Sequence, residues 1–145
     1  MNTTACTPPS DSTQRACLQW YQIDPRDPNS FTIQQQALVQ LAGYHFFAPG
    51  IAANNQGHAV LAYNVSGTDH YAGMNFSGRY HTDPLKTLQP SFQQVKSGEG
   101  CYERANGQNT VSLNSEVTVD PIDDSMFWLT SGYVYGKDAS CQKND

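Results

Sequence analysis

The amino-acid sequence predicts an all-β protein. Three observations support this prediction: short segments rich in strand-forming residues recur along the chain, clusters of Gly, Asn, Asp and Pro separate them, and no segment keeps a sustained helical period. At 145 residues the chain has the length of one ordinary domain. We therefore expect antiparallel strands that are joined by tight turns.

Residues 1–16 are predicted to form an extended arm. They are rich in Thr, Ser and Pro and show no periodicity. An arm of this composition stays ordered only when a disulfide, the body of the domain or a neighbouring subunit holds it. A neighbour's open sheet edge is one such partner, because an extended segment can add to it as a strand.

Residues 17–145 are expected to form a single β domain. Segments such as DPRDPN, SGTD and DPIDD are typical of turns and separate the candidate strands. The one helical candidate, Ile33–Leu41, is weak, because its Gln-rich run has neither a cap nor a sustained 3.6-residue period. The predicted strands span 17–23, 30–39, 50–54, 58–66, 71–80, 91–97, 116–120 and 125–133.

Two internal similarities predict a repeated unit. Residues 24–35 resemble residues 83–94, because both segments run from Asp-Pro to Ser-Phe and then to Gln-Gln. GIAANNQGHAVLAY at 50–63 likewise resembles EVTVDPIDDSMFWLT at 116–130, since each passes from an alternating strand through an Asn- or Asp-led turn into a more hydrophobic strand. Such a period indicates stacked β units that cannot bury their faces alone. We expect two propeller-like repeats, at about 17–80 and 81–145.

The composition argues against nucleic-acid binding and against a membrane span, and it favours an exported protein. The net charge is −5 and the basic residues form no cluster, so nucleic acid is not expected to bind. No apolar stretch approaches the length of a membrane span. Charged residues make up only 14%, with polarity supplied by Asn, Gln, Ser and Thr. We predict a secreted, extracellular protein, although the chain starts without the pattern of a secretory signal.

The four cysteines, Cys6, Cys17, Cys101 and Cys141, fit no zinc motif. An even number without CxxC spacing favours disulfides and an oxidising compartment. Three pairings are possible, and four reduced thiols are the alternative. We prefer Cys6–Cys17 with Cys101–Cys141, because the first pair closes a short local loop.

The segment VDPIDDSMFWLT at 119–130 resembles a blade motif of secreted bacterial sialidase-like (BNR-type) β-propeller proteins. Residues 46–67 and 71–80 look like opening strands of a preceding blade in the same proteins. The resemblance covers about 18–135 and implies four-stranded antiparallel blades around a channel. The chain departs from the pattern because it lacks the Ser-x-Asp-x-Gly-x-Thr-Trp box and has VSLNS at 111–115 instead of a Trp-Gly-Asp-Tyr-Ser-like run.

The predicted strands supply about two blades, whereas a closed propeller takes four to eight. Three arrangements follow. The chain is a piece of a longer propeller, several copies assemble into a ring, or the strands close as a compact sandwich. Open strand edges and apolar faces need partners, so we expect self-association.

Three aspartates, Asp120, Asp123 and Asp124, follow the strand at 116–120. Their carboxylates are close enough in sequence to make them a weak calcium candidate, because calcium selects oxygen-rich loops. EF-hand spacing is absent, however, and Asp-Pro followed by Asp-Asp is typical of a turn whose side chains cap backbone N–H groups. We favour the turn, and expect no metal or other cofactor apart from possible calcium.

Exposed aromatic side chains are the candidate ligand-binding groups. Phe127 and Trp128 must point to opposite sides of their strand, which leaves one of them for a surface or an interface. Tyr and Trp beside Asn, Gln and Asp suit a sugar, and they suit a subunit contact equally well. The candidates are Trp128, Tyr133 and Tyr80.

No catalytic residue is predicted. The motifs of serine and cysteine nucleophiles are absent. The resemblance implies that a sialidase site would need clustered arginines, a Tyr/Glu pair and an acid. Such a site could draw on Arg79, Arg104, Tyr102 and Glu103, but nothing in their spacing requires it. His58 and His70 would need adjacent positions and a third ligand to bind a metal.

The sequence therefore predicts a non-enzymatic, secreted β protein that assembles with itself into an oligomer or an extracellular fibre. Its role would be structural or adhesive, or would involve binding a glycan. The alternative is a fragment or subunit of a sialidase-like glycoside hydrolase.

Overall fold

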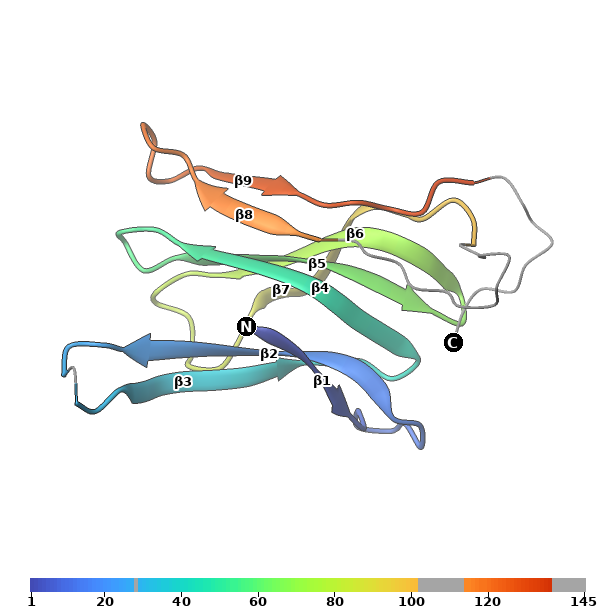
Figure 1. Cartoon of the computed structure of the whole chain (residues 1–145), viewed down its shortest axis with the longest axis horizontal. Coiled ribbons are helices and arrows are strands. Elements are labelled where there is room, and N and C mark those ends of the chain that lie inside the picture. Colours follow the sequence, from blue (N-terminus) through green and yellow to red (C-terminus); the bar gives the residue numbers. More distant parts are fainter. Residues whose placement is uncertain (28, 102–113, 137–145) are drawn as a thin grey trace.

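The computed structural model describes residues 1–27, 29–101 and 114–136 of the chain. Over these residues it contains nine strands in three antiparallel sheets and no helix (Figure 1). The prediction of an all-β, antiparallel protein is confirmed. None of the described residues belongs to a helix that would be able to span a bilayer.

Sheet A is formed by β1 (Asn2–Cys6), β2 (Arg15–Asp24) and β3 (Thr32–Val39), in that order. The central strand β2 is buried mainly in its first six residues, where Cys17, Leu18 and Trp20 are buried, and it is exposed toward its end. A disulfide between Cys6 and Cys17 links β1 to β2, as predicted.

Part of the predicted arm is thus a strand of sheet A, in register with β2 from Asn2 opposite Gln19 to Cys6 opposite Arg15. Of the second predicted disulfide, Cys101 is disulfide-bonded. Cys141 lies outside the described residues.

Sheet B is a meander of β4 (Tyr44–Ala53), β5 (Ala59–Gly67), β6 (His70–Arg79) and β7 (Gln89–Lys96). Each strand pairs with the next along the chain, as short turns between antiparallel strands allow. The predicted strand at 50–54 is longer than expected, because a bulge between Phe47 and Gly50 lets β4 continue past a proline.

The turn between β4 and β5 is formed by an asparagine and a glycine. Asn54 Oδ1 accepts hydrogen bonds from the backbone N–H groups of Gln56 (3.1 Å) and His58 (2.9 Å). Gly57 has a φ of 80°, in the left-handed region that favours glycine, and its N–H donates to the Asn54 carbonyl at 3.0 Å. The predicted turn NNQG is therefore built as its residues indicate.

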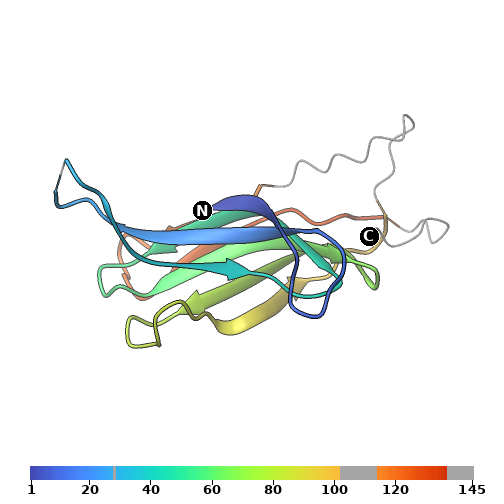
Figure 2. The ribbon, with the colours of Figure 1, turned by 90° about the horizontal axis from the view of Figure 1, so that it is seen from below.

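A third layer is the hairpin of β8 (Glu116–Val119) and β9 (Phe127–Thr130). Sheet B lies between this hairpin and sheet A, as Figure 1 shows, and Figure 2 views the same stack from the side of sheet A. The hairpin is held through the buried Asn64 of β5, whose Nδ2 donates to the carbonyl of Gly132 at 2.7 Å. Asn64 Oδ1 accepts from the Ser131 hydroxyl at 3.1 Å.

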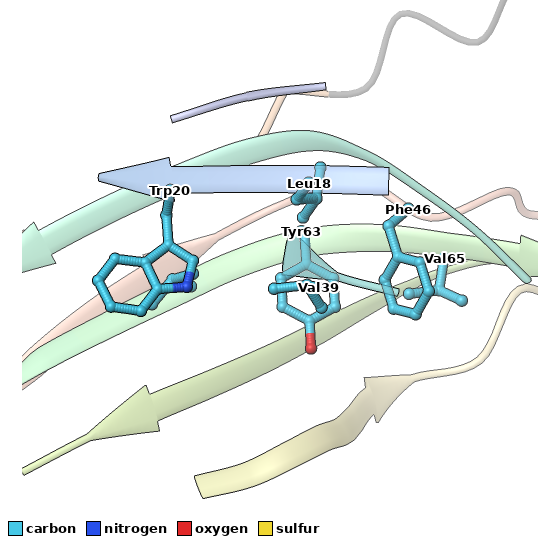
Figure 3. Packing of buried hydrophobic residues seen from close by; sticks show 7 residues of the cluster. Leu18, Trp20, Val39, Phe46, Tyr63 and Val65 are labelled. Carbon is cyan, nitrogen blue, oxygen red and sulfur yellow. The ribbon is translucent and has the colours of Figure 1, made fainter. Parts of the chain in front are cut away.

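The hydrophobic core lies between sheets A and B (Figure 3). Alternation along β5 sends Leu61, Tyr63 and Val65 toward sheet A and leaves Asn64 for the hairpin. Burial raises the pKa of Tyr63 to about 12, and its hydroxyl lies 2.6 Å from the Ser77 hydroxyl. The other core side chains come from three strands and are Leu18, Trp20, Val39 and Phe46.

The sheets stack face to face, and over the described residues no closed propeller or barrel forms. The strand predicted at 30–39 is confirmed as β3, and the weak helical candidate Ile33–Leu41 does not form over residues 33–39. Pairing with β2 decides this, because tertiary contacts override a modest helical propensity. The predicted strand at 125–133 shortens to β9, because Met126 still belongs to the preceding turn.

Candidate functional site

The aspartate turn, residues 120–126, joins β8 to β9. Asp120 Oδ1 accepts hydrogen bonds from the backbone N–H groups of Ile122 (2.8 Å) and Asp123 (3.0 Å). Its Oδ2 accepts from the indole N–H of Trp128 at 2.8 Å. These bonds hold the pKa of Asp120 below its usual value. The bond from the Asp123 backbone has the largest effect, and the bond from Trp128 the next largest.

The other two carboxylates of the turn have their own donors. Asp123 Oδ1 accepts from the Ser125 hydroxyl (2.6 Å) and backbone N–H (2.9 Å), which lowers the pKa of Asp123. Asp124 Oδ1 accepts from the backbone and side-chain N–H groups of Asn55, both at 3.2 Å. The described residues contain no group of three His, Cys, Asp or Glu placed to hold a metal ion. The geometry is that of a capped turn, and calcium binding stays a prediction.

The aspartate turn docks on the turn between β4 and β5. Asn54 Nδ2 donates to the carbonyl of Asp124 at 2.8 Å, in addition to the bonds from Asn55. At the other end of the two hairpins, a Cβ placed on Gly50 would lie 2.4 Å from the Ser115 carbonyl oxygen. The two segments that resemble each other in sequence are therefore both hairpins and pack against each other.

The three candidate ligand-binding aromatics lie in different surroundings. Trp128 is 56% exposed and borders a hollow of about 290 Å³ between β4 and the hairpin, which includes neither tyrosine. The ring of Tyr133 lies 4.9 Å from Lys96 Nζ, a cation–π contact. Tyr80 is 64% exposed and meets His58 edge-on at 5.0 Å. A role in glycan binding stays a prediction for each of them.

The histidines do not form the pair that a metal site would need. His58 directly precedes β5, at the end where Ala59 pairs with Arg79, and its Nδ1 accepts from the backbone N–H of His81 at 3.1 Å. His70 lies at the opposite end of the same strand pair, opposite Gly67. Although β5 and β6 are adjacent, their register separates the two imidazoles.

The described arginines bind different partners in different parts of the fold. Arg15 Nε donates to Asp11 at 2.9 Å, and Arg26 pairs with Asp24 in the turn after β2. Arg79, only 7% exposed, donates to the Gln35 side chain and to the Asp83 carbonyl. Residues 102, 103 and 104, which the hydrolase alternative also needs, lie outside the described residues.

A pocket of about 150 Å³ opens where sheet A ends at β3. We call it the edge pocket. Side chains of the last strands of both sheets line it, together with core residues and the segment that leads into β7. Its wall is mainly apolar and includes Trp20, Val39, Leu41, Phe46, Leu88 and Phe92.

Trp20, one of the residues that line the edge pocket, carries an unsatisfied polar group. Trp20 is 3% exposed, and its indole N–H has no hydrogen-bond partner. Figure 3 shows the indole nitrogen on the side of the ring that faces Val39, another residue of the pocket wall. A buried N–H without an acceptor costs free energy.

Sequence reasoning anticipated open edges but not this pocket. The aromatic and aliphatic residues of its wall come from segments far apart in the chain, so no local pattern marks them. One local signal was present. Natural edge strands usually carry a charged residue or a proline, and the run TIQQQALV at 32–39 has neither.

Comparison with known proteins identifies no relative. No known family matches the chain, no curated protein is significantly similar to it in sequence, and no solved structure matches its fold. The resemblance to sialidase-like propellers therefore stays an expectation from the segment at 119–130.

Proposed function

We propose that the protein is a secreted, non-enzymatic structural or adhesive protein that assembles with copies of itself through the open edge of β3. The observation that supports this most strongly is the edge itself. β3 pairs with β2 on one side, and no described strand pairs with it on the other. A row of unpaired backbone groups of this length is a template for strand addition.

The side chains of β3 do not protect this edge. Thr32–Val39 contains no charged residue and no proline, and Ile33 and Leu38 are 53% and 42% exposed. Charged residues, prolines and bulges are the usual means by which proteins block edge-to-edge pairing, and of these β3 has only a register shift against β2, at Gln34. An edge without charges or prolines is expected to take a partner.

The two edge strands of sheet B, β7 and β4, are less suited to pairing than β3. β7 carries Pro90, which has no backbone N–H, and Lys96, and its pairing with β6 is interrupted by two register shifts. β4 contains Pro49 and a bulge, and the hairpin packs against it at Gly50. Of the long strands at sheet edges in the described structure, β3 is the one best suited to pairing.

Two further observations support the other parts of the proposal. The Cys6–Cys17 disulfide is compatible with an oxidising, extracellular compartment. The sequential four-stranded order of β4 to β7 is that of a propeller blade, so assembly of copies, or continuation in a longer chain, would supply the further blades that the resemblance implies.

The native mass tests the proposal. The protein should sediment and elute well above its 16.0 kDa monomer mass, with an equilibrium that depends on concentration. Ile33→Lys combined with Gln36→Lys should shift it to monomer, since both side chains are exposed and the added charges would repel those of the arriving copy. Ile122→Lys is the control, because Ile122 is 96% exposed in the aspartate turn.

A protein that is monomeric at every accessible concentration would contradict the proposal. So would a double Lys variant that keeps its β-sheet circular dichroism and assembles like the unmodified chain. Release of a chromophore from fluorogenic glycosides by the purified protein would instead favour the hydrolase alternative.

A further inference from the structure

The geometry points to a binding site for a neutral saccharide in the hollow between β4 and the β8–β9 hairpin, where one sugar ring stacks on the indole of Trp128. This site does not depend on assembly through β3. The hairpin lies on the side of sheet B away from sheet A (Figure 1). Among the described residues, the lining of the hollow comes from β4, β8, β9 and Ser115, and none of it from sheet A.

Trp128 provides an aromatic surface whose orientation is fixed. Its side chain is 56% exposed, and its indole N–H donates to Asp120 Oδ2 at 2.8 Å. Asp120 is itself held by two backbone N–H groups of the aspartate turn. The bond to Asp120 uses the edge of the indole rather than a face. A side chain that is already held in place loses little conformational freedom when a ligand binds to it.

Polar side chains lie beside this aromatic surface, on the same face of the hairpin. Thr118 is directly opposite Trp128, and Glu116 is opposite Thr130, in a register without shifts. All four residues are exposed and border the hollow. Directly opposed residues have Cβ atoms about 4.5–5.5 Å apart, and diagonal neighbours lie about 7–8 Å apart. A ring that lies on the indole therefore comes within reach of the Thr118 hydroxyl and the Glu116 carboxylate.

These groups match the chemistry of a sugar. A pyranose has a face of C–H groups that packs on an aromatic ring, and a rim of hydroxyls that donate and accept hydrogen bonds. A carboxylate accepts from two neighbouring hydroxyls at once, and neither Glu116 nor Thr130 has a hydrogen-bond partner among the described residues. A protein partner fits less well, because it would cover the Glu116 charge, and charged residues are depleted in the cores of interfaces.

The charge and the size of the hollow restrict the ligand further. The described lining contains the Glu116 carboxylate and no Lys, Arg or His. Sialic and uronic acids carry a carboxylate that Glu116 would repel, so the site selects neutral sugars. Its volume of about 290 Å³ is at the lower limit of small-molecule sites, about 300–1,000 Å³, which suits a single ring.

Titration of the isotope-labelled, full-length protein with methyl glucoside, methyl galactoside and methyl mannoside tests the site by nuclear magnetic resonance. At least one of the three should shift the indole N–H resonance of Trp128 in a saturable manner below about 100 mM, because one partly exposed ring gives a weak affinity. The indole resonance of Trp20, which is 3% exposed, should not move. Methyl glucuronide is the anionic counterpart of methyl glucoside and should bind severalfold more weakly.

Variants assign the roles of the two main side chains, with binding followed on the proton signals of the sugar. Trp128→Ala should raise the dissociation constant at least tenfold, because the stacking surface is lost. Tyr80→Ala is the matched control, since Tyr80 is an aromatic residue that is 64% exposed and lies outside the hollow. Glu116→Lys should reduce the preference for methyl glucoside over methyl glucuronide severalfold, because the charge beside the ring is reversed.

Three results would overturn the inference. The first is a Trp128 resonance that none of the three neutral sugars shifts. The second is sugar binding that survives Trp128→Ala. The third is a Trp128 resonance that moves with protein concentration and not with sugar, which would assign the hollow to a second copy of the chain. None of them bears on assembly through β3, which the native mass tests separately.

Discussion

At the scale of single residues, the chain uses aspartates as structural acceptors. Asp11 accepts hydrogen bonds from the backbone N–H groups of Thr13 (2.9 Å) and Gly43 (3.0 Å) and pairs with Arg15. It thereby ties the loop between β1 and β2 to the start of β4. These hydrogen bonds lower the pKa of Asp11 to about 2. The bond from Gly43 contributes most to this shift, followed by those from Thr13 and Arg15.

This pKa predicts a loss of stability in acid. Because the folded state lowers the pKa of Asp11 below its unfolded value of about 3.9, its contribution is fully present above that pH. It is lost as the pH falls to about 2, where the folded state also takes up the proton. Asp11→Asn should therefore be less stable than the unmodified protein at pH 6 and differ little from it near pH 2.

Urea unfolding across this pH range measures the effect. Gln14→Ala, at an exposed position of the same loop, is the control, because it changes no titratable group and its effect should not depend on pH in the same way. A difference for Asp11→Asn that stays constant from pH 6 to pH 2 would refute the role given to the Asp11 carboxylate.

At the scale of elements, the β8–β9 hairpin depends on close backbone approach and a few hydrogen bonds. Asn64 anchors the segment after β9, and Asn54 and Asn55 hold the aspartate turn. Glycine at position 50 lets the Ser115 carbonyl approach β4. The hairpin is thus attached mainly by polar contacts, whereas sheets A and B are joined by the hydrophobic core.

Gly50→Ala should displace this hairpin. The added Cβ would meet the Ser115 carbonyl at 2.4 Å, so the backbone must shift, and we expect the free energy of unfolding to fall by about 1–3 kcal/mol. Gly136→Ala is the control, because a Cβ there meets nothing within 4 Å. Denaturant unfolding gives the free energies, and hydrogen exchange should show lower protection in β8 and β9 only. Equal stability of the two variants would contradict the close approach.

At the scale of the whole molecule, a three-layered stack with an uncharged open edge predicts how assembly responds to salt. The strand β3 carries no charge of its own, and the proposed assembly would cover its exposed Ile33 and Leu38. The native mass at fixed protein concentration should therefore not decrease between about 0.05 M and 0.5 M NaCl, a range over which contacts between exposed charges weaken strongly. Dissociation at high salt, followed by sedimentation velocity, would assign assembly to charged surfaces instead.

The sequence by itself determined the class of the fold and its local chemistry. The breakers and strand-forming runs were sufficient to place most strands, because turn residues act through their own backbone preferences. The spacing of Cys6 and Cys17 indicated their disulfide, and Asp-Pro-x-Asp-Asp indicated a capped turn. These features depend on neighbours in the chain, which a sequence displays directly.

Only the tertiary structure decided how these elements meet. It separated His58 from His70 through the register of β5 and β6, and it stacked the sheets face to face. The edge pocket likewise joins Trp20 with Phe92, which lie far apart in the chain. Such outcomes depend on long-range packing, in which a shift of register by one residue turns every side chain of a strand to the other face, and no local pattern records that choice.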